Sequence, residues 1–209
     1  MSDLAAAVLE CARAMNRSGI NRGTAGNVSV RSDGGFIVTP TGMDYAQALS
    51  QDMVFVDMNG VARGTRAPSS EWRFHRDIYA ARPEAGAIVH THAPFATSLA
   101  CLGTEIPPFH YMIARFGGDT VRCADYATFG TQALSDAMLT ALDGRSACLM
   151  ANHGMAVFGR DLAQALAHAI ELEALCEQYW RALQIGQPRL LPADEMQRVL
   201  EKFATYGQQ

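Results

Sequence analysis

Apolar residues recur along this chain at helical spacing in some segments and at strand spacing in others. The first helical segment covers residues 3–17, where an amphipathic pattern is built from Leu4, Val8, Leu9, Ala12 and Met15. The same spacing predicts further helices at 69–81, 94–102, 131–142, 162–185 and 193–206.

Short strand-like segments fill the intervals between these helices. Strands at 27–31, 36–39 and 54–57 are separated by turns that contain Gly, Pro or Asn, which predicts an antiparallel sheet. Continuous apolar runs at 85–89 and 147–151 are typical of buried strands, and a last strand is expected at 155–158. This mixture of elements predicts α/β layers around a mixed sheet.

Length, hydrophobicity and charge limit the class of protein. The chain has 209 residues, 49% of them hydrophobic, which suits one sizeable core, so we expect one domain over residues 1–209. Apolar stretches fall short of the roughly 20 residues that cross a bilayer, and the N-terminal segment lacks a signal-peptide core, so we expect a cytoplasmic protein without membrane binding. A net charge of −4 without a basic run argues against nucleic-acid binding.

The number and positions of the cysteines and lysines limit the kinds of site and reaction mechanism to be considered. The 5 cysteines are scattered and form no C-x-x-C pair, which indicates neither a disulfide framework nor a structural zinc knuckle. Lys202 is the only lysine, and its position in the last expected helix is typical of a solvated surface charge. A Schiff-base mechanism needs a desolvated lysine in a pocket, so a metal is the remaining electrophile if the chain handles carbonyl carbanions.

Three histidines stand at the ends of expected buried strands. His90 and His92 follow the run at 85–89, and side chains two residues apart in a strand project from the same face. His153 follows the run at 147–151, and Gly154 is expected to let the backbone turn away and leave the imidazole free. Three imidazole nitrogens suit Zn²⁺ and leave one position open for substrate, although strand-end histidines that are only hydrogen-bonded are the plain alternative.

A fourth candidate ligand, Glu71, is expected in the first turn of the helix at 69–81. A carboxylate there is favoured by the helix dipole, and simple capping is the commoner meaning of such a pattern.

Turns at 23–27, 41–42 and 69–70 offer hydroxyl, amide and backbone N–H groups that together suit a phosphate without lysine, although each alone is ordinary turn or cap chemistry.

Several short motifs occur along the chain in an order that is typical of one protein family. They are Gly23-Thr24-Ala25-Gly26-Asn27-Val28-Ser29, Thr39-Pro40-Thr41-Gly42, Pro68-Ser69-Ser70-Glu71, His90-Thr91-His92 and Asn152-His153-Gly154. In this order and spacing they resemble the class II aldolase/adducin family, and the resemblance runs essentially from end to end. The segments 70–75, 110–114, 126–131 and 202–207 are similar to the bacterial L-fuculose-1-phosphate aldolase branch of that family.

The resemblance implies a three-layer α/β/α domain of class II aldolase/adducin type, with a central mixed and largely antiparallel sheet. It also implies a C4 homotetramer with one zinc ion per subunit, close to the subunit interface. The matching zinc ligands are His90, His92 and His153, and Glu71 matches a carboxylate that binds zinc in the resting enzyme and then acts as acid and base.

The remaining site residues are carried over in the same way. The residues that match the phosphate-binding positions are Asn27, Thr41, Gly42, Ser69 and Ser70. Tyr111 matches a tyrosine from the neighbouring subunit that protonates the aldehyde-derived oxygen, and Phe129 and Tyr206 match residues near the aldehyde pocket. The other histidines, His75, His110 and His168, match no ligand position and are expected to be structural or on the surface.

The implied reaction is reversible cleavage of a ketose 1-phosphate, by way of an enediolate that zinc stabilises as a Lewis acid, to dihydroxyacetone phosphate and an aldehyde. L-Fuculose 1-phosphate is one implied substrate. Asn152 stands where we expect His in the fuculose branch, so 5-deoxyribulose 1-phosphate and 5-methylthioribulose 1-phosphate stay open. A pentulose 5-phosphate 4-epimerase using the same retro-aldol chemistry and a non-catalytic adducin-like interaction module are the alternatives, and Ser70-Glu71-Trp72 disfavours a methylthioribulose-phosphate dehydratase.

Overall fold

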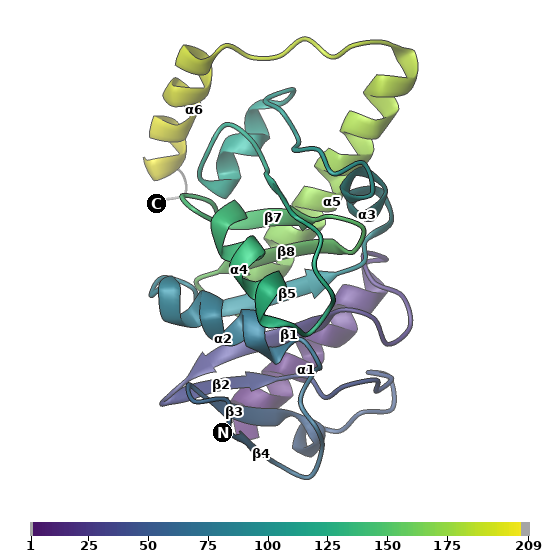
Figure 1. Cartoon of the computed structure of the whole chain (residues 1–209), viewed down its shortest axis with the longest axis vertical. Coiled ribbons are helices and arrows are strands. Elements are labelled where there is room, and N and C mark those ends of the chain that lie inside the picture. The colour runs from purple at the N-terminus through teal and green to yellow at the C-terminus, as the bar shows by residue number, and fades with distance from the viewer. Residues whose placement is uncertain (1, 206–209) are drawn as a thin grey trace.

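A mixed, eight-stranded sheet runs through the centre of the structure, a computed structural model that describes residues 2–205 (Figure 1). The strand order is β4-β3-β2-β1-β5-β8-β7-β6. Neighbouring strands are antiparallel except for β6 and β7, which are parallel. The strands are β1 (Asn27–Ser32), β2 (Gly35–Val38), β3 (Val54–Asp57), β4 (Ala62–Arg63), β5 (Ala87–Thr91), β6 (Cys123–Ala124), β7 (Ala147–Met150) and β8 (Gly154–Gly159).

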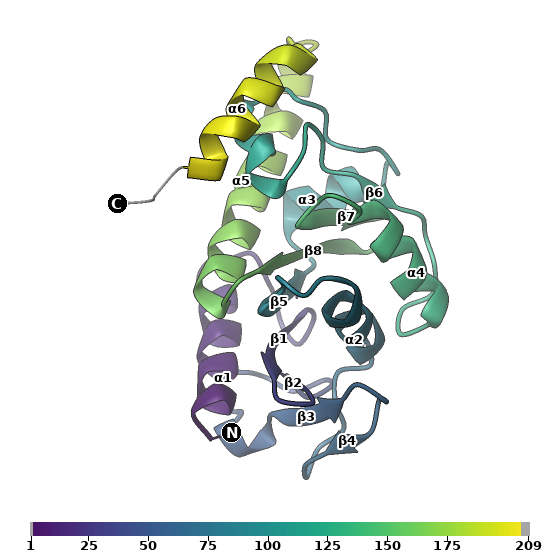
Figure 2. The ribbon, with the colours of Figure 1, turned by 90° about the vertical axis from the view of Figure 1, so that its left-hand side faces the viewer.

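Helices cover both faces of this sheet, which confirms the expected three-layer α/β/α arrangement (Figure 2). One face carries α1 (Ser2–Arg17), α3 (Pro94–Ala100) and α5 (Leu162–Ile185), and the other carries α2 (Trp72–Ala81) and α4 (Gln132–Ala141). The inner strands therefore contribute side chains to two hydrophobic cores. Val89 packs on the α1 and α5 side, and its neighbour Ile88 packs on the α2 side. Burial on both faces is why these strands read as continuous apolar runs.

A smaller substructure lies at one end of the molecule, where α6 (Ala193–Thr205) packs against the 3₁₀ helix η2 (Tyr111–Phe116) (Figure 1). A second 3₁₀ helix, η1 (Ser50–Asp52), precedes β3. Within the described part of the chain, no helix is both long and apolar enough to cross a membrane.

The expected elements are confirmed with small shifts at their ends, and two differences have physical causes. β4 and β6 were not expected because strands of two residues are too short to show a periodicity. The helix expected at 69–81 begins only at Trp72, because the preceding segment pairs with another loop: Pro40 and Pro68 form an antiparallel bridge, and the Ser69 amide donates to the Thr39 carbonyl. Ser69 is thereby held beside Thr39, and a turn at Ser70 and Glu71 leads into the helix.

Candidate metal centre

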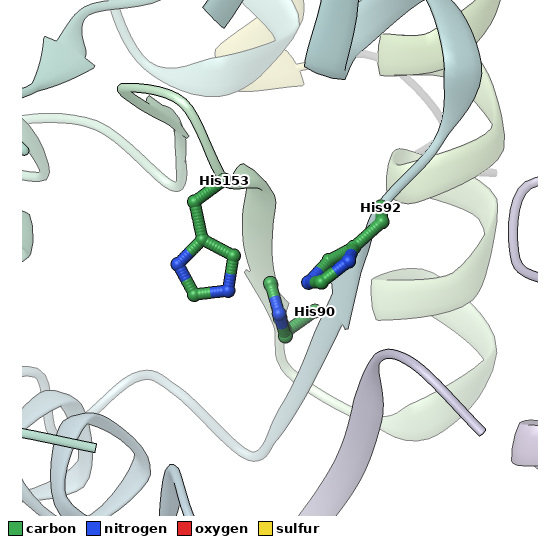
Figure 3. A group of neighbouring side chains, drawn as sticks. All are labelled: His90, His92 and His153. Atoms are coloured by element: carbon green, nitrogen blue, oxygen red, sulfur yellow. The ribbon is translucent and has the colours of Figure 1, made fainter. Parts of the chain in front are cut away.

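The three histidines expected as metal ligands lie close together at one end of the central strands β5 and β8 (Figure 3). His90 belongs to β5, His92 lies just beyond its end, and His153 lies in the turn between β7 and β8. One ring nitrogen from each lies within 4.8 Å of the others. The strands β5 and β7 are not neighbours, but β8 lies between them, and its first residues pair with the end of β5 at Thr91 and Met155.

The turn before β8 presents His153 differently from the expectation. Gly154 does not have the left-handed backbone that a glycine turn implies; Asn152 has it instead, with φ of 55°. Asparagine tolerates this region better than most residues. Gly154 is needed for space, because a Cβ there would lie 2.4 Å from the Thr91 carbonyl oxygen and 3.1 Å from the His92 ring.

The buried ring of His90 has a defined orientation. Its Nδ1 lies 2.8 Å from the Met155 carbonyl oxygen, which can only accept a hydrogen bond, so Nδ1 carries the proton. Nε2 then offers its lone pair to the centre of the cluster, and it is buried without a hydrogen-bond partner. Metal-binding histidines are typically oriented by such a bond from the other ring nitrogen.

Glu71 faces the same centre. It occupies the N-cap position of α2, and its side chain makes no capping bond, so the first-turn placement and the capping explanation are both wrong for this carboxylate. Its Oε2 lies 3.2 Å from Nε2 of His90, and its Oε1 lies 3.2 Å from Nε2 of His153. Asn27 donates from Nδ2 to Oε2 at 3.0 Å.

The electrostatics of the cluster favour a cation. Burial raises the pKa of Glu71, but the charge of His90 and the contacts with His153 outweigh it, so the net pKa lies below its ordinary value and the carboxylate stays ionised. Burial also lowers the pKa of His90, and the facing Glu71 charge raises it above its usual range. Positive charge beside Glu71 is therefore stabilised, whether it is carried by a second proton on His90 or by a metal ion in the place of that proton, and Glu71 Oε1 is buried without a hydrogen-bond partner.

These donors fit a divalent metal ion. Three imidazole nitrogens and one carboxylate oxygen are ligands that Zn²⁺ takes in a four-coordinate site. Burial, followed by the charges of His90 and His153, lowers the pKa of His92 to about 4, so its ring is neutral and able to coordinate. His92 and His153 are the more exposed members of the cluster, which leaves one side of it open to the adjoining cavity.

Helix α3 fixes the backbone that follows His92. Its first residues present unpaired backbone N–H groups, and the buried Glu173 of α5 accepts from two of them, on Phe95 and Ala96, at 2.8 Å each. A carboxylate at a helix N-terminus is stabilised by both the hydrogen bonds and the helix dipole. The path of the chain from His92 into α3 is thus tied to α5.

A cavity of about 310 Å³ adjoins the cluster. Its wall includes all the residues expected to bind phosphate, together with three of the candidate metal ligands: Asn27, Thr41, Gly42, Ser69, Ser70, Glu71, His92 and His153. The bridge between Pro40 and Pro68 brings the Thr41 and Ser69 segments together. Among the described residues no lysine or arginine lines this cavity, and its polar lining consists of hydroxyls and amides together with Glu71, His92 and His153.

Of the three residues expected at the aldehyde end, one lines this cavity, one lies elsewhere in the chain, and one is outside the described residues. Phe129 lines the cavity and is 64% exposed. Tyr111 is 51% exposed and lies in η2, where it borders a separate cavity of about 680 Å³ with α6, so a single chain does not bring it to the histidines. Tyr206 lies outside the described residues.

Thr24, from the turn at 23–27 that was expected to suit a phosphate, also lines the cavity. Tyr126 and Ala127 line it too and were not expected, because nothing in their spacing distinguishes them from ordinary loop residues. His75 is not a candidate ligand, but it is buried and bonds to Asn27. His110 accepts from the Met112 amide, and the mostly buried His168 packs edge-on against Phe116, so both have structural roles.

Comparisons with known proteins agree with this geometry. A family model described as Class II Aldolase and Adducin N-terminal domain matches residues 6–180. A 5-methylthioribulose-1-phosphate/5-deoxyribulose-1-phosphate aldolase of Rhodospirillum rubrum is 57% identical over 96% of this chain and 90% of its own. An L-fuculose phosphate aldolase of Escherichia coli K12 is 45% identical over 98% of this chain and 95% of its own. A solved L-fuculose 1-phosphate aldolase superposes with a TM-score of 0.94 at 37% identity, covering 98% of this chain and 97% of its own.

The similarity covers nearly the whole chain and includes the part that holds the histidines and Glu71. It confirms the expectation of an aldolase-type enzyme of the aldehyde-lyase class. The chain belongs to the class II aldolase and adducin N-terminal domain family.

Proposed function

We propose that this enzyme is a zinc-dependent aldolase that reversibly cleaves a ketose 1-phosphate to dihydroxyacetone phosphate and an aldehyde. The observation that carries the proposal is the grouping of three imidazoles with Glu71, where Glu71, His92 and His153 line a cavity whose wall also contains the hydroxyls of Thr41, Ser69 and Ser70. The relatives named as aldolases of 5-methylthioribulose, 5-deoxyribulose and fuculose phosphates support this substrate class.

The phosphate is assigned to the end of the cavity formed by Thr41, Gly42, Ser69 and Ser70, with the Asn27 amide beside it. The hydroxyls donate to phosphate oxygens, and the N-terminus of α2 favours negative charge. Because this end is remote from the bond that breaks, its contribution is binding energy and orientation of the substrate.

Cleavage between C3 and C4 leaves an electron pair on the dihydroxyacetone phosphate fragment, and C3 must then receive a proton. A divalent cation held by the imidazoles supplies a Lewis acid for this fragment. Glu71 is in contact with His90 and His153 and also lines the cavity, so we assign the proton transfer at C3 to its carboxylate.

The aldehyde end is assigned to the side of the cavity with Tyr126, Ala127 and Phe129. These side chains are mainly apolar and suit a substrate whose last carbon carries a methyl or methylthio group. The 57% identity to the Rhodospirillum rubrum enzyme supports the 5-deoxy and 5-methylthio pentulose phosphates as the first substrates to test. L-Fuculose 1-phosphate is the next.

The site is assigned to a homotetramer in which a neighbouring copy completes it. Tyr111 is exposed on η2, away from the histidines of its own chain, and in the direction of bond formation its phenol is suited to donate a proton to the aldehyde-derived oxygen, which becomes the C4 hydroxyl.

The substrate assignment predicts a ranking of rates. An assay for released dihydroxyacetone phosphate, applied to 5-methylthioribulose, 5-deoxyribulose, fuculose, rhamnulose and ribulose 1-phosphates, should give the highest kcat/KM for the first two.

Glu71→Gln should lose about 10²–10⁴-fold in kcat, since general acid–base catalysis contributes that much. The matched control is Glu177→Gln, which changes a partly exposed carboxylate on α5 that pairs with Arg181, and it should keep the rate.

Three outcomes would contradict the proposal. No triose release from any of these sugars would reject the aldolase reaction, and isomer formation from a pentulose 5-phosphate without release would identify an epimerase. A near-normal rate in Glu71→Gln would remove its acid–base role.

Metal dependence gives a second prediction. Purified protein should hold about one zinc per subunit and lose turnover when a chelator removes it, with recovery on zinc addition. His153→Ala should weaken zinc binding more than about 100-fold, because even loss of a hydrogen-bond partner behind a ligand costs about 10–100-fold. His168→Ala is the control. Full turnover in verified metal-free protein would reject the zinc-dependent mechanism.

The shared site predicts complementation between inactive variants. Glu71→Gln and Tyr111→Phe, each with low activity alone, should recover part of it when co-expressed, because mixed tetramers contain sites with both native residues. Glu71→Gln with His153→Ala should not recover, since both changes affect residues that one chain contributes. Equal behaviour of the two pairs would place Tyr111 outside the site.

A further inference from the structure

A buried chain of hydrogen bonds extends from Glu71 into the layer between α2 and the sheet. Asn27 Nδ2 bonds to Glu71 at 3.0 Å, and Asn27 Oδ1 lies 2.5 Å from His75 Nε2. The other ring nitrogen of His75, Nδ1, lies 2.7 Å from the Ser29 hydroxyl, which lies 2.8 Å from the Tyr79 hydroxyl. All these residues are buried.

The helical spacing of four residues on α2 and the strand spacing of two residues on β1 place these side chains together. His75 and Tyr79 are four residues apart on α2 and continue the line that begins at Glu71, so the three side chains share one face of the helix. Asn27 and Ser29 are two residues apart on β1 and point to the same side of the sheet. An otherwise apolar interface therefore contains one continuous polar line that ends at the candidate metal centre.

The direction of each hydrogen bond follows from the one at Glu71. An ionised carboxylate only accepts, so Asn27 must turn its NH₂ group toward Glu71 and its carbonyl oxygen toward His75. That oxygen needs a donor, so the proton of the His75 ring is on Nε2. The Nδ1 atom then accepts from Ser29, whose oxygen in turn accepts from Tyr79.

The surroundings of His75 keep its ring neutral. It is fully buried, and it stacks on Phe74 at a centroid distance of 4.5 Å and on Phe36 at 6.3 Å. Burial lowers the pKa of His75 to about 3, although the nearby Glu71 charge opposes the shift. Burial also raises the pKa of Tyr79, so its hydroxyl remains a donor at the far end.

We propose that His75 is a positioning residue: its Nε2–H fixes the orientation of the Asn27 amide, so that an N–H and not a carbonyl oxygen faces Glu71. With the amide reversed, two oxygen acceptors would face each other in a buried site, and the carboxylate would be displaced from the histidines. The effect on catalysis rests on the proposed aldolase function, whereas the bond directions do not.

The first test reads the proton position directly. In zinc-loaded protein labelled with ¹⁵N-histidine, two-bond ¹⁵N–¹H correlation spectra distinguish a proton on Nε2 from one on Nδ1. The signal that disappears in His75→Gln should show a neutral ring with the proton on Nε2, whereas His90 should show it on Nδ1. A His75 ring with the proton on Nδ1, or a charged ring, would overturn the proposal without any reference to substrate.

The second test separates orientation from packing. Gln at position 75 reaches far enough to donate where Nε2 lies, Asn is too short, and Leu has no donor. We expect His75→Asn and His75→Leu to lose about 10–100-fold in kcat or in zinc affinity with KM little changed, because hydrogen-bond partners behind a metal ligand contribute about that much. His75→Gln should stay close to the native values.

The control is His168→Gln, which changes a mostly buried histidine that has no contact with this chain of hydrogen bonds. Circular dichroism and thermal unfolding identify the folded variants to be compared. Equal losses in the folded Gln, Asn and Leu variants at position 75 would show a packing role only and reject the proposal. If none of the sugar phosphates is cleaved, the proposed function fails, and the zinc affinities and the proton position still decide the role of His75.

Discussion

The contact between Glu71 and two imidazole nitrogens is the interaction on which the rest of the site depends. Each carboxylate oxygen lies 3.2 Å from a ring nitrogen, and Oε1 and the His90 Nε2 are buried without hydrogen-bond partners. Buried acceptors that face one another are costly unless positive charge lies between them. The hydrogen bond from His90 to Met155 directs a lone pair at this point, so a divalent cation resolves the conflict.

The fold joins this centre to the cavity through one short segment. Ser69 and Ser70 line the end assigned to phosphate, and Glu71 follows them directly at the start of α2. The bridge between Pro40 and Pro68 and the bond from the Ser69 amide to the Thr39 carbonyl hold the start of this segment against another loop, and a turn at Ser70 and Glu71 then leads into α2. The spacing between the anion-binding hydroxyls and the carboxylate is therefore set by consecutive backbone units, and the reacting carbons of a bound sugar phosphate would lie at a fixed distance from both.

Periodic apolar patterns predicted the long helices and the inner strands, because burial on two faces leaves a strong signal in sequence. The grouping of all three histidines was implied by the family resemblance. The pattern did not predict that β8 lies between β5 and β7, since strand order depends on long-range pairing. It also misassigned the turn geometry to Gly154 in place of Asn152, and it gave His75 no specific partner. The spacing of Glu71, His75 and Tyr79 at intervals of four within an apolar helix face was a readable signal of that buried polar line.

The most direct test of the central claim is X-ray absorption at the zinc edge of the zinc-loaded protein. A site made of three histidines should give scattering from three imidazole rings, with nitrogen and oxygen neighbours at about 2.0–2.1 Å and none of the sulfur neighbours found near about 2.3 Å in cysteine sites. The imidazole scattering should fall by one ring in a variant that lacks His153 and still binds zinc. Sulfur ligands or fewer than three imidazoles in the spectrum would contradict a three-histidine zinc site. Failure of the protein to retain zinc would contradict it as well.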